Sequence, residues 1–186
     1  VGGFGRNPER EACLITYAAG EPDLILPDLS YEVDFGVLKL SIINTNSLDV
    51  MQGRDVHASW QDYDGWRVIA GHHVYRTFHD KVHEDIVAPW LKLNGLKPDL
   101  YLNGHAHILQ FGVYDGIPAL TSGATAKTRE RPVCPPDCGK GQRFGVSTPG
   151  YALVSFDRSR MRVVFKDTKR NVLFKWSKKR VKKTRR

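Results

Sequence analysis

Three histidines have the residue type and spacing for metal-ion chemistry. His72 and His105 each follow a glycine at the end of a short apolar run, and His107 lies two positions after His105. Glycine lets the backbone turn sharply beside a bound metal ion, and neutral imidazole is the commonest nitrogen ligand for Zn, Fe, Mn and Ni. We therefore predict His72, His105 and His107 as metal ligands, and we assign no catalytic residue. The other histidines are interpreted as surface or packing residues: His57, His73, His79 and His83. His73 is an exception among them, because it lies next to His72.

Predicted strands position these histidines. The apolar runs 66–70 and 99–102 read as buried strands that end in Gly-His and in Gly-His-Ala-His, respectively. Between them, residues 81–94 have apolar positions at close to helical spacing, followed by an Asn-Gly stop. In α/β sheets the chemistry lies at the carboxyl ends of the strands, so both His-bearing loops are expected at one edge of the sheet.

The rest of the chain predicts mostly β-structure. A helix is expected near residues 10–19, and residues 31–35 and 37–44 form a hairpin or a bulged bend. The stretch 127–148 is rich in Pro, Gly and charge and is expected to be a loop. The fold class is therefore α/β, with a mixed β-sheet and a flanking helix, followed by antiparallel strands. The further predicted strands are 109–114, 117–122, 151–156, 162–166 and 172–176.

The composition indicates one domain with a basic tail. The 186 residues are 41% hydrophobic, and no apolar run approaches the ~20 residues of a membrane span. The net charge is +8, and residues 175–186 hold eight Lys or Arg and no acid, which leaves the remaining body neutral. We expect a domain over 1–174 and a flexible tail over 175–186, which either binds RNA or an acidic surface or is merely solvated. Its proposed contact residues are Lys178, Lys179, Arg180, Lys182, Lys183, Arg185 and Arg186.

The cysteines are too few for a disulfide framework. An odd count of three, Cys13, Cys134 and Cys138, leaves free thiols or one local disulfide between Cys134 and Cys138. A structural zinc site needs four ligands, and no second cysteine pair exists to complete one.

The order strand–Gly-His, helix, strand–Gly-His-x-His resembles the calcineurin-like metallophosphoesterases. Within them it looks most like the C-terminal half of a small purple acid phosphatase of the tartrate-resistant type. That resemblance implies one half of a two-sheet sandwich. The segments that carry it, in chain order, are 31–46, Val68-Ile-Ala-Gly-His72, Tyr101-Leu-Asn-Gly-His-Ala-His107, Ser122-Gly-Ala124 and Pro149-Gly-Tyr-Ala-Leu-Val154.

The resemblance also implies roles for the three histidines. His72 and His105 would bind a divalent metal ion, and His107 would bind the ferric or equivalent ion. Two metal ions would then activate a bridging hydroxide for attack on phosphorus, and a further histidine would protonate the leaving oxygen.

The sequence departs from the family pattern in its N-terminal part. No segment resembles the motifs that supply an Asp, a bridging Asp and a Tyr. The third motif aligns with residues 1–5, where Gly3 stands for the metal-binding Asn and Phe4 for the acid/base His. We therefore expect at most one weakly bound divalent ion, Zn, Fe or Mn. A dinuclear Fe/Zn or Fe/Fe centre is expected only where a missing N-terminal half is supplied.

Two functions from different classes follow. The first is a catalytically degenerate body that serves as a structural or interaction subunit of a larger assembly, such as a ribonucleoprotein. The alternative is an active dinuclear-metal phosphomonoesterase, completed by the missing half. A simple metal- or nucleic-acid-binding module is a third interpretation. Half of a sandwich leaves apolar sheet open, so we expect a partner chain or the missing half to cover it. No signal peptide is seen, and an intracellular or organellar assembly is favoured over a secreted protein.

Overall fold

The computed structural model describes residues 8–76, 86–130 and 133–181. The helices are α1 (Pro8–Gly20), α2 (Val50–Ser59) and α3 (Val87–Leu93). The strands are β1 (Tyr31–Asp34), β2 (Leu38–Ile42), β3 (Trp66–Ala70), β4 (Leu100–Asn103), β5 (Leu109–Tyr114), β6 (Ile117–Ser122), β7 (Gln142–Val146), β8 (Gly150–Phe156), β9 (Arg160–Asp167) and β10 (Val172–Lys179). Among the described residues, no helix is long and apolar enough to cross a membrane.

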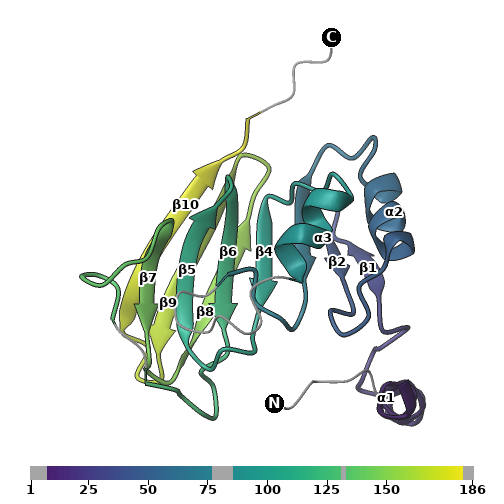
Figure 1. Cartoon of the computed structure of the whole chain (residues 1–186), viewed down its shortest axis with the longest axis horizontal. Coiled ribbons are helices and arrows are strands. Elements are labelled where there is room, and N and C mark those ends of the chain that lie inside the picture. The colour runs from purple at the N-terminus through teal and green to yellow at the C-terminus, as the bar shows by residue number, and fades with distance from the viewer. Residues whose placement is uncertain (1–7, 77–85, 131–132, 182–186) are drawn as a thin grey trace.

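The strands form two sheets of unequal width. The large sheet has seven strands in the order β1-β2-β3-β4-β6-β5-β7, and the small sheet has three in the order β10-β9-β8 (Figure 1). Strands β2, β3, β4 and β6 run parallel, whereas β1, β5 and β7 pair antiparallel with their neighbours. The small sheet is antiparallel throughout. Because β3 and β4 are parallel neighbours, their carboxyl ends lie side by side.

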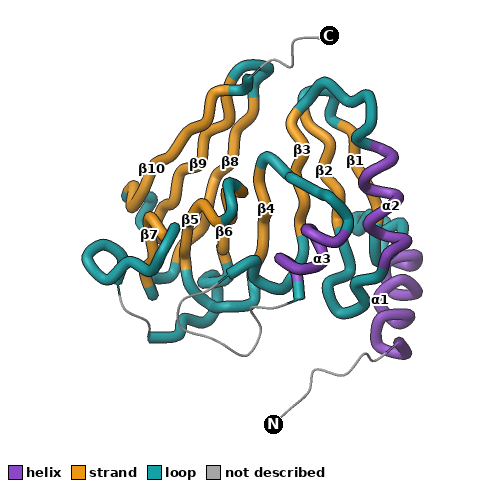
Figure 2. The backbone as a smooth tube through the Cα atoms, turned by 45° about the horizontal axis from the view of Figure 1, so that its top comes forward, coloured by secondary structure: helices purple, strands orange, loops and turns teal. Residues whose placement is uncertain are grey.

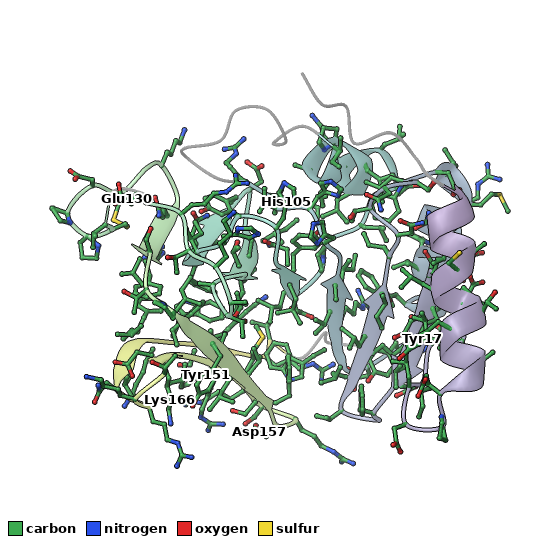
Figure 3. The ribbon with its side chains drawn as sticks, turned by 90° about the horizontal axis from the view of Figure 1, so that it is seen from below. Tyr17, His105, Glu130, Tyr151, Asp157 and Lys166 are labelled. Atoms are coloured by element: carbon green, nitrogen blue, oxygen red, sulfur yellow. A yellow bond between two sulfur atoms is a disulfide. The ribbon has the colours of Figure 1, made fainter. Side chains whose placement is uncertain are left out.

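Apolar side chains on both faces of the large sheet build two cores. On one face, Ile69 and Tyr101 pack with Trp90 and Leu91 of α3. On the other face, the buried side chains of the large sheet meet those of the small sheet, including Phe165. The view from below separates these layers, with the small sheet on the side of Tyr151, Asp157 and Lys166 (Figure 3). The predicted mixed α/β architecture is confirmed.

Helix α2 has no counterpart among the predicted elements. Its sequence, Val-Met-Gln-Gly-Arg-Asp-Val-His-Ala-Ser, has a weak apolar stripe, and only Gly53 and Val56 are buried. Capping and tertiary contacts stabilise it instead. The Asp49 carboxylate accepts a hydrogen bond from the Gln52 backbone N–H at 2.8 Å, and the Trp90 indole N–H donates to the Asp49 carbonyl at 2.7 Å. The tube in Figure 2 shows α2 beside β1.

The expected loop 127–148 contains a strand. β7 pairs antiparallel with β5, and its Phe144 is only 4% exposed against the sheet interface. The same stretch contains the disulfide between Cys134 and Cys138, so local disulfide formation, one of the two alternatives, is the outcome. The Pro and Gly content of this stretch favoured the prediction of a loop. The strand is stabilised by aromatic side chains that are distant in the sequence.

The boundary of the basic tail was also predicted too early. β10 continues to Lys179, so residues 175–179 are strand rather than tail. Lys175 and Lys179 are exposed, whereas Trp176 packs against the core, so lysines on the solvent face do not prevent strand formation. The predicted helices at 10–19 and 81–94 correspond to α1 and α3, although residues 81–85 lie outside the described ranges.

Candidate metal centre

The loops after β3 and β4 bring two predicted ligands together. His72 Nε2 lies 2.9 Å from His105 Nδ1, and the two rings meet edge to face with centroids 4.8 Å apart. A hydrogen bond between two imidazoles requires one of these nitrogens to carry the proton. The prediction that these histidines lie at one sheet edge is therefore confirmed, and Figure 3 shows where His105 lies.

Two glycines permit this close approach. A Cβ atom on Gly71 would lie 2.5 Å from Thr45 Cγ2 and 2.9 Å from the Tyr101 hydroxyl. A Cβ on Gly123 would lie 3.0 Å from the backbone nitrogen of His107. Any larger side chain at either position would push a histidine loop away from the sheet.

The histidine loop has an unusual backbone. His105 has φ 55° and His107 has φ 50°, in the left-handed region that residues other than glycine rarely adopt. Such conformations cost on the order of 1–3 kcal/mol each, and they gather at functional sites. The Gly123 N–H holds the loop by donating to the Ile108 carbonyl at 3.1 Å. The surrounding structure therefore imposes a strained conformation at both histidines.

His107 and His73 lie near the pair formed by His72 and His105, and their surroundings differ. His107 Nδ1 is buried without a hydrogen-bond partner. Burial lowers the pKa of His72, and the nearby charge of His107 lowers it further, so the neutral, ligand-competent form of His72 is favoured. His73 is 6% exposed, its Nδ1 lies 2.8 Å from Thr45 Oγ1, and its ring borders that of His105 at 5.0 Å. Its interpretation as a packing residue agrees with this burial.

Asn103 was not among the predicted site residues. It ends β4 immediately before the histidine loop and is 8% exposed. Neither its side-chain oxygen nor its side-chain nitrogen has a hydrogen-bond partner. Buried polar groups are nearly always paired, so each exception calls for an explanation. The sequence signal was its place between an apolar strand and a Gly-His pair.

The described residues do not by themselves fit a metal centre. Over 8–76, 86–130 and 133–181, no group of three or more His, Cys, Asp or Glu side chains gathers closely enough to hold a metal ion. Protein zinc sites use three or four ligands. His72 and His105 offer two nitrogens, and His107 does not join them in such a group. The aligned positions Gly3 and Phe4 lie outside the described residues.

Two of the predicted nucleic-acid contacts pair with acids of the body. The Lys178 ammonium lies 2.9 Å from Asp99, and the Arg180 guanidinium lies 2.5 Å from Asp64. Lys179, between them, is exposed. The other proposed contacts, Lys182, Lys183, Arg185 and Arg186, lie outside the described residues.

Comparison with known proteins gives both sequence and fold relatives. The chain is 34% identical over 118 residues to purple acid phosphatase 17 of Arabidopsis thaliana, covering 60% of this chain and 34% of that protein. Purple acid phosphatase 4 of the same plant is 33% identical over 120 residues, with the same coverage. The chain thus spans about a third of the length of these relatives. No family model matches the chain.

Two solved structures share the fold at low sequence identity. GAP50, described as the anchor in the inner membrane complex of Plasmodium, matches 86% of this chain and 56% of its own with a TM-score of 0.63 and 15% identity. PhoD matches 90% of this chain and 46% of its own with a TM-score of 0.62 and 12% identity. Together with the plant relatives, they confirm the resemblance to calcineurin-like metallophosphoesterases and to purple acid phosphatases among them.

Proposed function

We propose that these 186 residues form a structural or interaction body with a metallophosphoesterase-like fold and do not hydrolyse phosphate esters by themselves. One observation carries the proposal. His72 Nε2 and His105 Nδ1 lie 2.9 Å apart, yet the described residues contain no group of three or more His, Cys, Asp or Glu side chains that could hold a metal ion.

Charge explains why this pair is insufficient. Neutral imidazoles bring no negative charge to offset two cations, and hydrolysis by paired metals needs those cations about 3.5–4 Å apart. Without bridging carboxylates the mutual repulsion of the ions is uncompensated. The site therefore supports at most one weakly held divalent ion, with Zn, Fe and Mn as the candidates.

The fold itself is compatible with a role other than catalysis. GAP50, which shares it, is described as an anchor in a membrane complex. A shared fold does not transfer function, so this likeness only establishes that the architecture is used for anchoring elsewhere.

Turnover on a generic aryl phosphate, with Fe, Zn or Mn added, tests the proposal. We expect no rate above that of the metal ions alone, and the same result for His105→Ala. A metal-dependent rate that disappears in His105→Ala would overturn the proposal. Circular dichroism of both proteins checks that each one is folded.

The alternative is a phosphomonoesterase that a further segment completes. The left-handed backbone at His105 and His107 favours it, because strain of this kind persists at sites where it serves a function. His107 Nδ1 and the Asn103 side chain, buried and without partners, are polar groups that such a segment could pair. Adding the N-terminal portion of a purple acid phosphatase, fused or in trans, tests this alternative. A His105-dependent rate supports it, and no rate from a well-folded complex contradicts it.

Part of the apolar surface between the two sheets is incompletely covered. This supports the presence of a covering partner under both the proposed function and its alternative. Leu40 of β2, Leu102 of β4 and Val154 of β8 belong to the core between the sheets but are only partly buried. Three strands at ~4.8 Å spacing cover roughly 10 Å, whereas seven span roughly 29 Å. We propose that a partner chain, or a further segment of the same protein, covers this strip.

For the basic end, we propose binding to RNA. Lys178 and Arg180 are paired with acids, so the principal contacts are Lys179, Lys182, Lys183, Arg185 and Arg186. Affinity for a single-stranded RNA is expected to fall steeply with salt and to disappear when residues 182–186 are deleted. An affinity unchanged by the deletion would contradict this proposal.

A further inference from the structure

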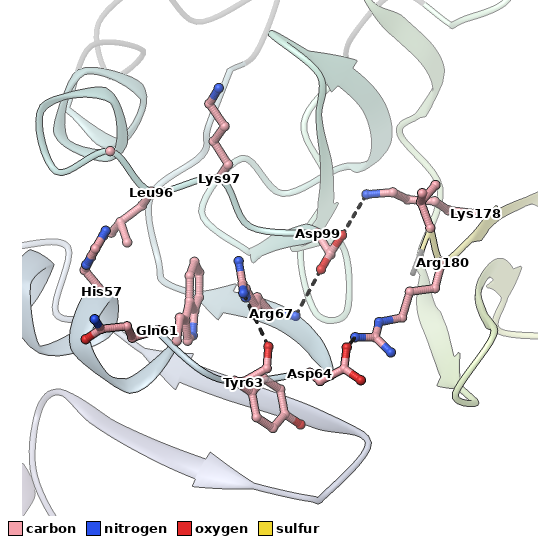
Figure 4. A pocket seen from close by; sticks show the side chains of 14 residues that line it. His57, Gln61, Tyr63, Asp64, Arg67, Leu96, Lys97, Asp99, Lys178 and Arg180 are labelled. Carbon is pink, nitrogen blue, oxygen red and sulfur yellow. Dashed lines mark hydrogen bonds and ion pairs between the residues drawn. The ribbon is translucent and has the colours of Figure 1, made fainter. Parts of the chain in front are cut away.

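A cavity lies at the opposite end of β3 from the histidines. It has a volume of about 620 Å³ and lies where the loops before β3 and β4 meet the end of β10 (Figure 4). Arg67, near the start of β3, lines this cavity, whereas His72 follows the end of the same strand. Five residues of extended chain separate them, or about 16 Å. The cavity is therefore distinct from the candidate metal centre.

Cations outnumber acids on the cavity wall. Four cationic side chains, Arg67, Lys97, Lys178 and Arg180, line it together with the two acids Asp64 and Asp99 (Figure 4). Lys178 pairs with Asp99, and Arg180 pairs with Asp64. Within the described part of the chain, neither Arg67 nor Lys97 makes an ion pair. Two positive charges on this wall thus have no carboxylate to balance them.

The Arg67 side chain is held in place with donors to spare. Its guanidinium lies over the Trp60 ring, 5.9 Å from the centroid, and Nη2 donates to the Tyr63 carbonyl at 3.3 Å. Its backbone N–H donates to Asp99 Oδ2 at 3.2 Å, which fixes the strand beneath it. A guanidinium carries five N–H donors in a planar fork that matches the oxygens of a phosphate group. Few of these donors are used inside the protein.

The acid that pairs with Arg180 is weakly held. The Asp64 side chain is 82% exposed, whereas that of Arg180 is only 15% exposed. Because the Asp64 carboxylate lies mostly in solvent, an incoming anion can take its place beside Arg180. Arg180 would then join Arg67 and Lys97 around the ligand.

We propose that this cavity binds the phosphate group of an anionic ligand, with Arg67 and Lys97 as its principal contacts and Arg180 as a third contact released from Asp64. The volume lies within the range of small-molecule sites, about 300–1,000 Å³. Phosphate is favoured over a carboxylate ligand because its three or more oxygens can engage converging cations from several elements at once.

Pyrophosphate titrated by calorimetry into the 186-residue chain tests the proposal. Lys97→Gln, at an exposed position, is expected to weaken binding roughly tenfold, as loss of a charge-assisted hydrogen bond does. Arg67→Gln is expected to weaken it at least as much. Asp64→Asn is expected to strengthen it roughly two- to fivefold, because Arg180 is freed. Lys140→Gln, an exposed lysine outside the cavity, is the matched control and should change nothing.

Several outcomes would overturn the proposal. One is an affinity that Lys97→Gln leaves unchanged, and another is an Asp64→Asn variant that binds no more tightly. A third is pyrophosphate binding lost on deletion of residues 182–186, which would assign it to the C-terminal end. Thermal melting shows whether Arg67→Gln is folded; if it is not, the exposed Lys97 and Asp64 variants decide.

A ten-nucleotide RNA distinguishes the sources of the phosphate. If the cavity takes a terminal or free phosphate, a 5′-phosphate on the RNA should raise affinity in the wild-type chain and not in Lys97→Gln. If RNA binds while pyrophosphate does not, the cavity proposal fails, and the RNA proposal for the C-terminal end remains a separate question.

Discussion

At the residue scale, the backbone strain and the buried polar groups of the histidine loop could not be predicted from the sequence, whereas the positions of the histidines could. The sequence was enough to predict that His72 and His105 would meet, because two apolar strands each end in Gly-His. The left-handed backbone at His105 and His107 could not be predicted, because it arises from tertiary packing of the Gly123 turn against the loop. For the same reason the buried, unpartnered Asn103 was missed.

The strain at His105 predicts that a glycine at this position gives a more stable protein than an alanine, the reverse of the usual order. His105→Gly relieves the left-handed conformation, which glycine adopts freely, whereas His105→Ala retains it. We expect the glycine variant to be more stable than the alanine variant by about 1 kcal/mol. Urea denaturation measures the difference. An alanine variant as stable as the glycine variant would show that the loop relaxes and that the histidines are not held under strain.

Tyr75 predicts how stability changes at alkaline pH. It is 3% exposed, and its hydroxyl donates to Asp115 at 3.3 Å. Burial, with the nearby Asp115 charge, raises the pKa of Tyr75 to about 12. An unfolded tyrosine ionises near pH 10, so this contribution is complete below pH 10 and is lost as the pH rises to 12.

The measurement is the free energy of unfolding between pH 9 and 12. Tyr75→Phe should lose less stability over this range than the wild type does, by on the order of 2 kcal/mol. Tyr17→Phe, on the exposed face of α1, is the control and should follow the wild-type curve. Parallel curves for Tyr75→Phe and the wild type would contradict the assignment.

At the element scale, the strands that contain an apolar run were predictable from the sequence. The elements that depend on tertiary contacts were not. β3, β4, β5 and β6 are nearly continuous apolar runs, and their bounds agree with those predicted from the sequence to within one residue. α2 and β7 lack such runs. Their formation depends on Asp49 capping and on Phe144 packing against Phe165 and Phe174, respectively.

The dependence of α2 on its cap predicts the effect of Asp49→Ala. The carboxylate accepts from the Gln52 N–H, and loss of such a cap costs about 1 kcal/mol. The hydrogen bond from Trp90 goes to the Asp49 carbonyl and is kept in the variant. Asp49→Asn, which retains a capping oxygen, should recover most of the loss. Thermal denaturation compares the two, and an equal loss in both would point to charge rather than capping.

At the scale of the whole molecule, the two edges of the small sheet differ in their protection. β10 carries three lysines, at 175, 178 and 179, whereas β8, Gly-Tyr-Ala-Leu-Val-Ser-Phe, carries no charge. Charged residues on an edge strand discourage pairing with other chains. In the described part of the chain, no strand pairs with the second edge of β8, and the partly covered Val154 lies on it. A covering segment would therefore dock at β8 rather than at β10.

This asymmetry predicts which edge mediates self-association when the 186 residues are studied alone. Leu153, 49% exposed on β8, and Val172, 48% exposed on β10, are matched sites on opposite edges. Leu153→Lys should shift the concentration dependence of sedimentation toward monomer, because a charge on the unprotected edge opposes strand pairing. Val172→Lys adds the same charge to an edge that lysines already protect and should have little effect. Equal effects of both would mean that net charge, rather than the open edge of β8, controls association, and the docking of a partner at β8 would lose its physical basis.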